Sequence, residues 1–315
     1  MSLLKAENPV AFFVNGIGDH LLSLPAIRAL AALYPQRLSL VCQRRRAGVF
    51  FRGLPFRQIL VEDVWGDDDW QTEVAEAARG CDLFLSLVPW QSDSLTSLRR
   101  RLAPEVSVGF FPDYDVALPL DYSKHSSDLA FSLPRYLDPS LRLEDFAAPP
   151  NFPPEAERRA ERIRGLIPLG TRVLVVHADT AEAKMWPAER FVAVLDAFLE
   201  RRPDFVTLVV GRRRLPLDAG RFNGRVVLCY GLPLGVSLCL TAKADVFLGV
   251  DSCFLHAADF CGVPGVGLFG STNSNEFGYR LTSHRHVCGG GDMKMIGEAD
   301  VLAALDSLLD EVVPA

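Results

Sequence analysis

The sequence lacks an excess of positive charge and lacks long hydrophobic runs. Its 33 Lys and Arg residues are outnumbered by 39 Asp and Glu residues, which gives a net charge of −6 at pH 7. Proteins that bind nucleic acids usually carry a basic excess, so the composition disfavours a nucleic-acid partner. The longest apolar runs, such as residues 10–14 and 83–89, are too short to cross a bilayer. We therefore expect a cytoplasmic protein without a transmembrane segment.

Paired cysteines and the common catalytic signatures are also missing. The seven cysteines are odd in number, none has CxxC spacing, and most lie in apolar runs. This pattern is typical of reduced, buried thiols rather than of a disulfide or zinc framework. The glycine motif after the first apolar run is not a GxGxxG fingerprint, because Leu21 occupies the third glycine position, and the sequence contains no Walker A, GxSxG or HExxH motif. Dinucleotide-dependent hydride transfer and zinc-dependent hydrolysis therefore lose their main sequence support.

A proline-rich segment divides the chain. Four prolines fall between residues 149 and 154, where they disfavour a continuous helix or a central strand. We interpret residues 149–157 as a linker between an N-terminal domain, residues 1–148, and a C-terminal domain, residues 158–297. Residues 298–315 are expected to form a C-terminal helix.

Short apolar runs alternate with amphipathic segments in both halves. Runs such as Val173–Val176 and Val206–Val210 are typical of parallel strands that are covered on both faces. Amphipathic segments such as residues 187–201 follow these runs with helical spacing, and leucines across residues 21–33 predict another helix. The alternation predicts an α/β fold with two Rossmann-like domains.

Polar motifs follow several of the predicted strands, where open α/β sheets bind ligands. The first motif, Asn15–His20, contains Gly16 and Gly18, which allow close approach of the backbone to a ligand. Asp19 has two interpretations, a carboxylate that faces a ligand or a helix N-cap. We expect His20 to be exposed in the first helical turn.

The second motif runs from His177 to Pro187. A hydroxyl at Thr180 and an ammonium at Lys184, close to a helix start, would suit a phosphate group. A solvated loop with an isolated lysine is the alternative.

The third motif places Asp251 and Ser252 at another strand-to-helix junction, with His256 four residues after Ser252. These residues face a ligand, or they cap the helix and pack in the core. Gly270 and Ser271 end a later strand and either line the same ligand or form a turn. No second close ligand accompanies His256, so we expect no metal site.

Three of these motifs together resemble glycosyltransferase family 9, the ADP-heptose heptosyltransferases. NGIGDHLLSLPAIRALAALYP resembles the opening segment of the family. HADTAEAKMWPAERF resembles its His…Thr…Lys-x-Trp-Pro segment, and GVDSCFLHAADFCGVPGVGLFGST resembles its Asp-Thr-Gly-x-x-His segment. The order and spacing of the motifs hold from about Val10 to Thr272.

The resemblance implies a GT-B fold, in which two Rossmann-like domains face each other across a cleft. The N-terminal domain would bind the acceptor and the C-terminal domain the nucleotide-sugar. It further implies inverting sugar transfer without a metal or cofactor, with ADP-heptose as the expected donor. Asp19 matches the general base of the family and Asp251 the contact to the donor sugar. The remaining matches are donor or phosphate contacts at Thr180, Lys184, Ser252, Cys253 and His256, and loop positions near the ligand at Gly16, Gly18, His177, Gly270 and Ser271.

Some positions depart from the family pattern. Asp179 stands where hydroxyl residues are common, Cys253 replaces a glycine, and Arg212–Arg214 follow a strand without a clear acidic residue for the ribose. The net charge of −6 leaves a small soluble acceptor open beside a lipopolysaccharide core. Two rival functions are a nucleotide-sugar epimerase with a GT-B-like fold and a non-catalytic nucleotide-sugar-binding protein.

Overall fold

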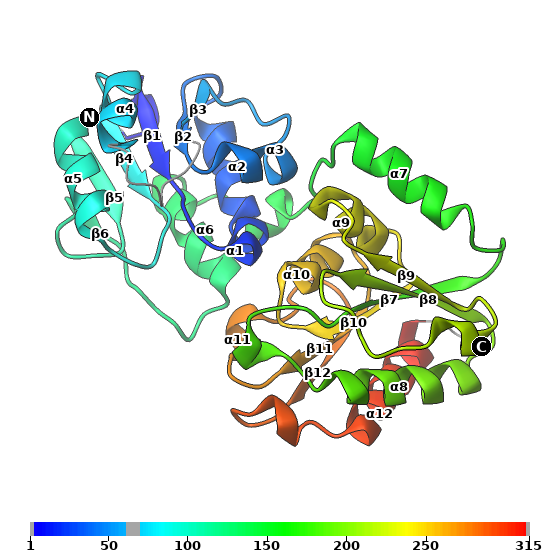
Figure 1. The fold of residues 1–315 in the computed structure, drawn as a ribbon. Coiled ribbons are helices and arrows are strands. Elements are labelled where there is room, and N and C mark those ends of the chain that lie inside the picture. The colour runs from blue at the N-terminus through cyan, green and yellow to red at the C-terminus, as the bar shows by residue number, and fades with distance from the viewer. Residues whose placement is uncertain (1–2, 61–69, 313–315) are drawn as a thin grey trace. The chain divides into compact units, whose positions relative to one another are not determined.

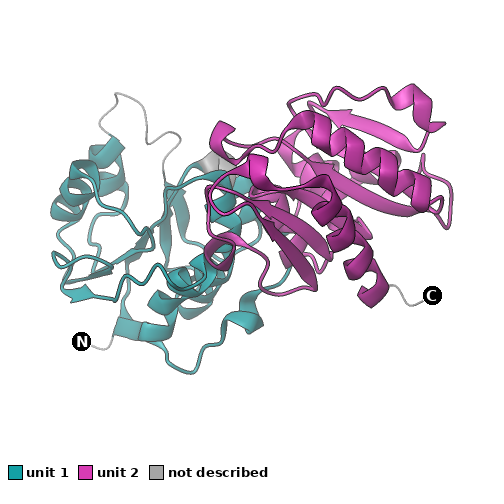
Figure 2. Ribbon diagram, turned by 90° about the horizontal axis from the view of Figure 1, so that it is seen from below, with its two compact units in different colours: residues 1–151 teal, residues 152–315 magenta. Residues whose placement is uncertain are grey.

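The computed structural model describes residues 3–60 and 70–312, and the chain divides into two compact units. Unit 1 comprises residues 1–151 and unit 2 residues 152–315 (Figure 2). The boundary falls inside the segment expected to be a linker. Helix α7 (Pro154–Arg164) nevertheless begins inside that segment. Proline is compatible with the first helical position because the N–H there has no partner within the helix.

Unit 1 is built on a six-stranded parallel sheet in the order β3-β2-β1-β4-β5-β6. Helices α4 and α5 pack against each other, and α2 packs against α6. The strands are β1 (Pro9–Phe12), β2 (Ser39–Val41), β3 (Gln58–Leu60), β4 (Leu83–Ser86), β5 (Val106–Gly109) and β6 (Val116–Ala117). The helices are α1 (Ile17–Leu22), α2 (Leu24–Leu33), α3 (Arg44–Phe50), α4 (Trp70–Ala77), α5 (Asp93–Leu102) and α6 (Ser126–Leu137).

Unit 2 repeats this plan with a second six-stranded parallel sheet, in the order β12-β11-β10-β7-β8-β9. Helices α8 and α12 cover one face of the sheet, and α9 and α10 cover the other (Figure 1). The strands are β7 (Arg172–His177), β8 (Phe205–Gly211), β9 (Val226–Tyr230), β10 (Val246–Val250), β11 (Gly265–Phe269) and β12 (His284–Cys288). The further helices are α8 (Ala188–Arg201), α9 (Leu234–Ala242), α10 (Cys253–Phe260), α11 (Ser274–Phe277) and α12 (Glu298–Val312).

The two parallel sheets confirm the α/β fold expected from the alternation of apolar runs and amphipathic segments. The helix expected over residues 21–33 is divided into α1 and α2 at Ser23. Pro25 explains the division, because a proline lacks the N–H that would continue the helical ladder and its ring crowds the preceding turn. Helix α12 occupies the expected C-terminal segment, of which residues 313–315 lie outside the described part.

The core of unit 2 fixes the carboxyl ends of its central strands. Strands β7 and β10 are buried along almost their whole length, and their side chains pack against α8 and α12. Phe198 and Phe205 pack edge to face within this core, with ring centroids 5.2 Å apart. The loops that leave β7 and β10 therefore start from rigid supports.

Candidate functional site

Strands β7 and β10 are neighbours at the point where the strand order of unit 2 reverses. From β7 the chain proceeds to β8 and β9 on one side, and then returns to β10 on the other side of β7. The loops that leave two such strands diverge, and open α/β sheets bind ligands between them. The motifs at residues 177–187 and 250–256 lie on these two loops.

A partly buried ion pair joins the two loops. The Nζ atom of Lys184 lies 2.7 Å from Oδ2 of Asp251, and the Asp251 side chain is only 3% exposed. The Thr180 hydroxyl donates a 3.0 Å hydrogen bond to the backbone carbonyl of Asp251. Burying a carboxylate is costly unless a cation and hydrogen bonds compensate for the lost water. These contacts bring together three residues that the sequence placed in two separate motifs.

The first turn of α10 borders this pair. Ser252 is the N-cap, and its Oγ accepts a 3.3 Å hydrogen bond from the backbone N–H of Phe254. The capping interpretation of Ser252 is therefore confirmed. His256 is buried, with Nε2 3.8 Å from Oδ1 of Asp251. Burial raises the pKa of the Cys253 thiol to about 12, so this side chain is an uncharged thiol at neutral pH.

His177, the last residue of β7, connects this strand to α10 and β8. Its ring stacks on Phe254 with centroids 4.0 Å apart, and its Nδ1 lies 3.2 Å from the carbonyl oxygen of Val210. Burial lowers the pKa of His177 to about 4, against the opposing effect of the Val210 carbonyl. The His177 ring is therefore neutral at pH 7, and it supports the first turn of α10 through its contact with Phe254. Its Nδ1–H donates the hydrogen bond to the carbonyl oxygen of Val210.

Asp179 turns out to organise a neighbouring loop. Its Oδ2 accepts hydrogen bonds from the backbone N–H groups of Arg212 and Arg213, at 2.9 and 3.1 Å. Gly211, which precedes them, has a φ of +138°, a conformation that favours glycine. The carboxylate at this unusual position thus holds the turn after β8.

The segment after β11 carries Ser271, which the sequence motifs included, and Glu276 and Phe277, which they missed. The Ser271 hydroxyl donates a 3.0 Å hydrogen bond to the carbonyl of Ala183, and the Phe277 ring centroid lies 5.8 Å from Nζ of Lys184. Burial, together with the charge of Asp251, raises the pKa of Glu276. Glu276 and Phe277 belong to the four-residue helix α11, which is too short to leave a periodic signal in the sequence.

Gly270 has a packing role. A Cβ at this position would lie 2.5 Å from the backbone nitrogen of Met293, so a larger residue would displace the segment that precedes α12. This close approach of Met293 accounts for a glycine at position 270, whereas Ser271 contacts the loop that carries Lys184.

The first motif lies in unit 1, after β1 and at the reversal of that sheet between β1 and β4. Asp19 is the third residue of α1, whose N-cap is Gly16, so the N-cap interpretation of Asp19 is wrong. A Cβ at Gly16 would come within 2.8 Å of Oδ2 of Asp19, which shows how closely this carboxylate approaches the glycine turn. Gly18 lies between these two residues in the first turn of α1.

His20 is fully buried, contrary to the expectation of an exposed residue. Its ring packs among Phe13, Phe50 and Phe51, and its Nδ1 lies 2.7 Å from the carbonyl oxygen of Gly16. The polar–apolar sequence pattern did not reveal this contact, because two of the aromatic rings come from a distant segment, Phe50 from the end of α3 and Phe51 from its C-cap.

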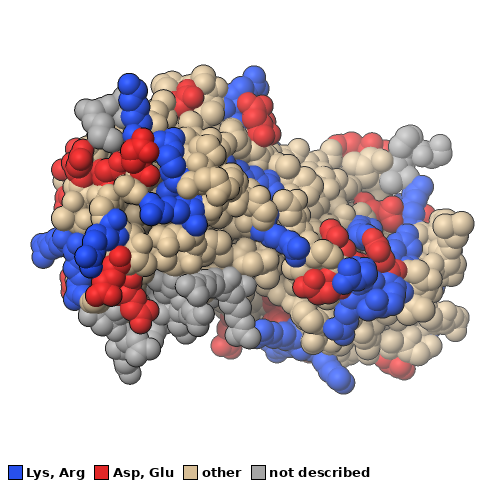
Figure 3. All heavy atoms as spheres, turned by 90° about the horizontal axis from the view of Figure 1, so that it is seen from above, with Lys and Arg blue, Asp and Glu red and all other residues tan. Residues whose placement is uncertain are grey.

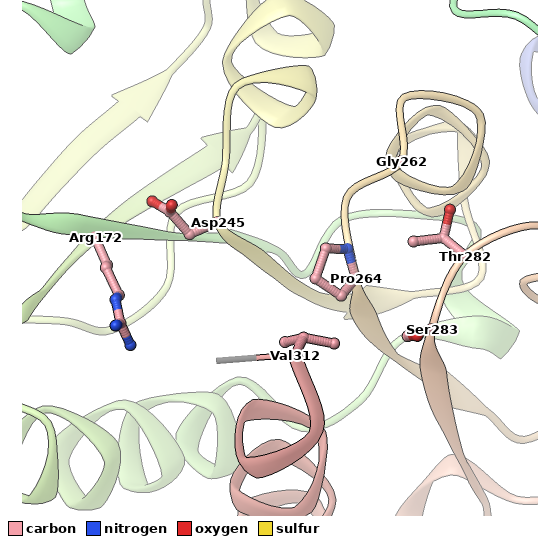
Figure 4. Close-up of a pocket in the computed structure, with 7 residues that line it drawn as sticks. All are labelled: Arg172, Asp245, Gly262, Pro264, Thr282, Ser283 and Val312. Atoms are coloured by element: carbon pink, nitrogen blue, oxygen red, sulfur yellow. The ribbon is translucent and has the colours of Figure 1, made fainter. Parts of the chain in front are cut away.

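A hollow of ≈ 560 Å³ lies at the opposite, amino-terminal edge of the unit 2 sheet (Figure 4). Asp245 accepts a 2.6 Å hydrogen bond from the backbone N–H of Val173. The Nη1 atom of Arg172 lies 3.6 Å from Oδ2 of Asp204, with which it forms an ion pair. Thr282 donates its hydroxyl proton to the carbonyl of Asp259. These polar groups have structural roles, so this hollow is not the candidate site. A smaller hollow of ≈ 320 Å³ adjoins the second motif at Met185, Trp186 and Arg213.

Comparison with known proteins shows a similarity to one family of enzymes. Residues 142–296 match the model of glycosyltransferase family 9 (heptosyltransferase). This part of the chain is similar to glycosyltransferase family 9. The matched stretch contains Thr180, Lys184 and Asp251, and it confirms the resemblance seen in the motifs. The chain is therefore a glycosyltransferase. No curated protein matches it.

Solved structures extend the similarity of fold to the whole chain. The glycosyl transferase family 9 protein of Veillonella parvula has a TM-score of 0.79 at 20% identity, and 99% of each chain is covered. E. coli heptosyltransferase WaaC with ADP has a TM-score of 0.68 at 15% identity, covering 97% of this chain and 100% of that one. E. coli ADP-heptose lps heptosyltransferase II has a TM-score of 0.69 at 14% identity, covering 96% and 99%. The GT-B fold expected from the sequence is confirmed.

The described residues form neither a metal-binding cluster nor a membrane-spanning helix. Within residues 3–60 and 70–312, no group of three or more His, Cys, Asp or Glu side chains is arranged to hold a metal ion. None of the helices described here is long and apolar enough to cross a membrane.

Proposed function

We propose that the chain transfers a heptose from ADP-heptose to an acceptor hydroxyl, with inversion at the anomeric carbon and without a metal ion. The observation that carries this proposal is the Lys184–Asp251 ion pair, at 2.7 Å, where the strand order of unit 2 reverses. A fixed ammonium at this position can stabilise the negative charge that develops on a leaving diphosphate. The solved relative WaaC contains ADP, which supports an adenine nucleotide as the leaving group.

The roles of the side chains follow from their chemistry. Lys184 would contact the diphosphate, and Thr180 and Asp251 would hold Lys184 and its loop in position. Asp251 would in addition contact the sugar, while Ser252, Cys253 and His256 form the wall at the first turn of α10. Asp19 would accept the proton of the acceptor hydroxyl as its oxygen attacks the anomeric carbon and the bond to the diphosphate breaks. The acceptor is a lipopolysaccharide core or a small soluble molecule.

Nucleotide binding is tested first, by thermal shift with ADP, UDP, GDP and dTDP in the presence of a chelator. A ligand that binds only the folded protein at about a hundred times its Kd stabilises it by about 2.7 kcal/mol. We expect a selective shift with ADP that is lost in Lys184→Ala. Lys243→Ala is the matched control, because Lys243 forms an ion pair with Glu161 outside the site. A shift with none of the nucleotides would contradict the assignment of the donor site.

Transfer is tested separately with Asp19→Asn. General base catalysis contributes about 10²–10⁴-fold, so turnover should fall by that factor while the ADP shift is retained. Full activity in this variant would exclude Asp19 as the base. Incubation with ADP-heptose alone distinguishes the epimerase alternative, because an epimerase converts its substrate without an acceptor.

A further inference from the structure

Glu276 is a partly buried carboxylate at the candidate site, and the proposed function gives it no role. It lies in the four-residue helix α11, directly before Phe277, whose ring centroid is 5.8 Å from Nζ of Lys184. This Nζ atom is in turn 2.7 Å from Oδ2 of Asp251. Burial and the charge of Asp251 both raise the pKa of Glu276, so the two carboxylates are close enough to interact. Glu276 therefore lies beside the ion pair of the site.

Contacts on both sides of α11 fix its position. Before the helix, the Ser271 hydroxyl donates a 3.0 Å hydrogen bond to the carbonyl of Ala183. After it, the backbone N–H of Tyr279 donates a 3.0 Å hydrogen bond to Nε2 of His286 in β12. Gly278 is buried, and a Cβ there would collide with the backbone of α11 and the His286 ring. Figure 1 shows α11 next to the loop that leaves β7, so the fold holds α11 at the site.

The Glu276 carboxylate lacks a partner in the protein. On the face of the molecule in Figure 3, acidic and basic groups lie close to each other. Within the part of the chain that the structure describes, by contrast, no group donates a hydrogen bond to Glu276 or forms an ion pair with it. A carboxylate that is partly removed from water and has no donor is unfavourable. A ligand whose hydroxyl groups donate to Glu276 would remove this penalty.

Asp251 itself has little capacity left to accept hydrogen bonds from a ligand. Its side chain is 3% exposed, its Oδ2 pairs with Lys184, and its Oδ1 lies 3.8 Å from Nε2 of His256. A transferred sugar carries several hydroxyl groups, and each of them can donate a strong hydrogen bond to a carboxylate oxygen. A sugar bound beside Asp251 therefore needs a further acceptor, and Glu276 is a carboxylate with free oxygens at that place.

We propose that Glu276 is a specificity-determining residue that accepts hydrogen bonds from hydroxyl groups of the transferred sugar. The inference rests on the proposed function, because it requires a nucleotide-sugar donor whose diphosphate is held by Lys184. The sugar hydroxyls would supply the donors that the protein does not, so binding of the donor would offset the cost of the isolated carboxylate. ADP lacks the transferred sugar, and a negative charge at Glu276 repels its diphosphate. Glu276 should therefore favour the binding of ADP-heptose but not the binding of ADP.

Calorimetric titration of the full-length protein with ADP and with ADP-heptose tests this role. We expect Glu276→Ala to raise the Kd for ADP-heptose about tenfold or more, as for the loss of a hydrogen bond to a charged group, without raising the Kd for ADP. Glu276→Gln should have a smaller effect, because its amide oxygen still accepts a hydrogen bond. Glu298→Gln is the matched control, because its carboxylate already pairs with Arg190, and it should bind both ligands like the parent.

Phe277→Leu is a contrasting variant on the same helix. The Phe277 ring contacts the Lys184 ammonium, which would bind the diphosphate present in both ligands. Loss of this cation–π contact should weaken ADP and ADP-heptose by the same factor, about two- to fivefold. If Glu276→Ala also weakened both ligands equally, Glu276 would act through Lys184, and the proposed contact with the sugar would be overturned.

Two further outcomes separate this inference from the proposed function. If the parent binds ADP and ADP-heptose and Glu276→Ala binds ADP-heptose as tightly as the parent, the role of Glu276 is overturned while the donor site stands. If the parent binds neither ligand, the proposed function is contradicted, and the role of Glu276 with it. Thermal unfolding of Glu276→Ala verifies that a loss of affinity does not come from a loss of the fold.

Discussion

At the scale of single residues, His177 couples the stability of unit 2 to pH. Burial lowers the pKa of His177 to about 4, whereas a histidine in an unfolded chain titrates near pH 6.5. Below about pH 6.5 the unfolded state therefore binds a proton at His177 that the folded state does not bind. The free energy of unfolding consequently falls as the pH falls towards 4. The loss attributable to this residue is about 2 kcal/mol at about pH 5.

His177→Phe tests this coupling, since phenylalanine keeps a ring to stack on Phe254 but does not titrate. We expect the variant to lose some stability at about pH 7.5, because the hydrogen bond to Val210 is gone, by about 1 kcal/mol. Its stability should then decline less than that of the parent towards about pH 5. Urea unfolding at both pH values measures the difference, and parallel declines in parent and variant would contradict the assignment.

Glu276 also makes the stability of unit 2 depend on pH, but in the opposite direction from His177. Burial and the charge of Asp251 raise its pKa, so at intermediate pH the folded state holds a proton that the unfolded state has released. Stability from this residue is therefore lost as the pH rises through its folded pKa. Glu276→Gln should make the protein more stable at neutral pH, with little effect in acid. Glu298→Gln is the control, because Glu298 is an exposed glutamate that pairs with Arg190. Urea unfolding in acid and at neutral pH measures the change in stability of each variant.

At the scale of elements, Asp259 of α10 organises the entry to β12. Its carboxylate accepts backbone N–H bonds from Arg280, Leu281 and Thr282, each at 2.9 Å, and its side chain is buried. Asp259→Ala would leave these donors without their acceptor, and we expect a loss of about 3–5 kcal/mol. Asp259→Asn should lose less, since one carbonyl oxygen still accepts. The control is Asp306→Asn, which removes an exposed pair with Arg201 worth about 1 kcal/mol or less, and thermal unfolding compares the three.

The elements also show what the sequence could and could not predict. Strands β7 and β10 were evident because they are buried on both faces and form continuous apolar runs. Strand β12 was missed because it is half-buried at the sheet edge and reads His-Arg-His-Val-Cys, without an apolar run. Helix α7 was missed because its first residue is a proline in a segment interpreted as a linker.

The residues of the candidate site could be predicted from the sequence only where they belong to a local motif. Lys184 and Asp251 were each found through a local motif, but their contact joins residues 67 positions apart. Only the parallel pairing of β7 with β10 brings the loops after these strands together. Glu276 and Phe277 carried no local signal, because they reach the site from a one-turn helix.

At the scale of the whole molecule, each unit has its own parallel sheet and its own core, so local stability should be set within a unit. Phe131 in unit 1 and Phe198 in unit 2 are both essentially unexposed, and truncation to alanine should cost about 3–5 kcal/mol in either case. We expect hydrogen exchange, followed by mass spectrometry, to accelerate only in peptides of residues 1–151 for Phe131→Ala and only in those of residues 152–315 for Phe198→Ala. ADP should slow exchange around β7 and β10 equally in the parent and in Phe131→Ala. Acceleration across the whole chain in both variants would instead show that the two units unfold as one cooperative structure.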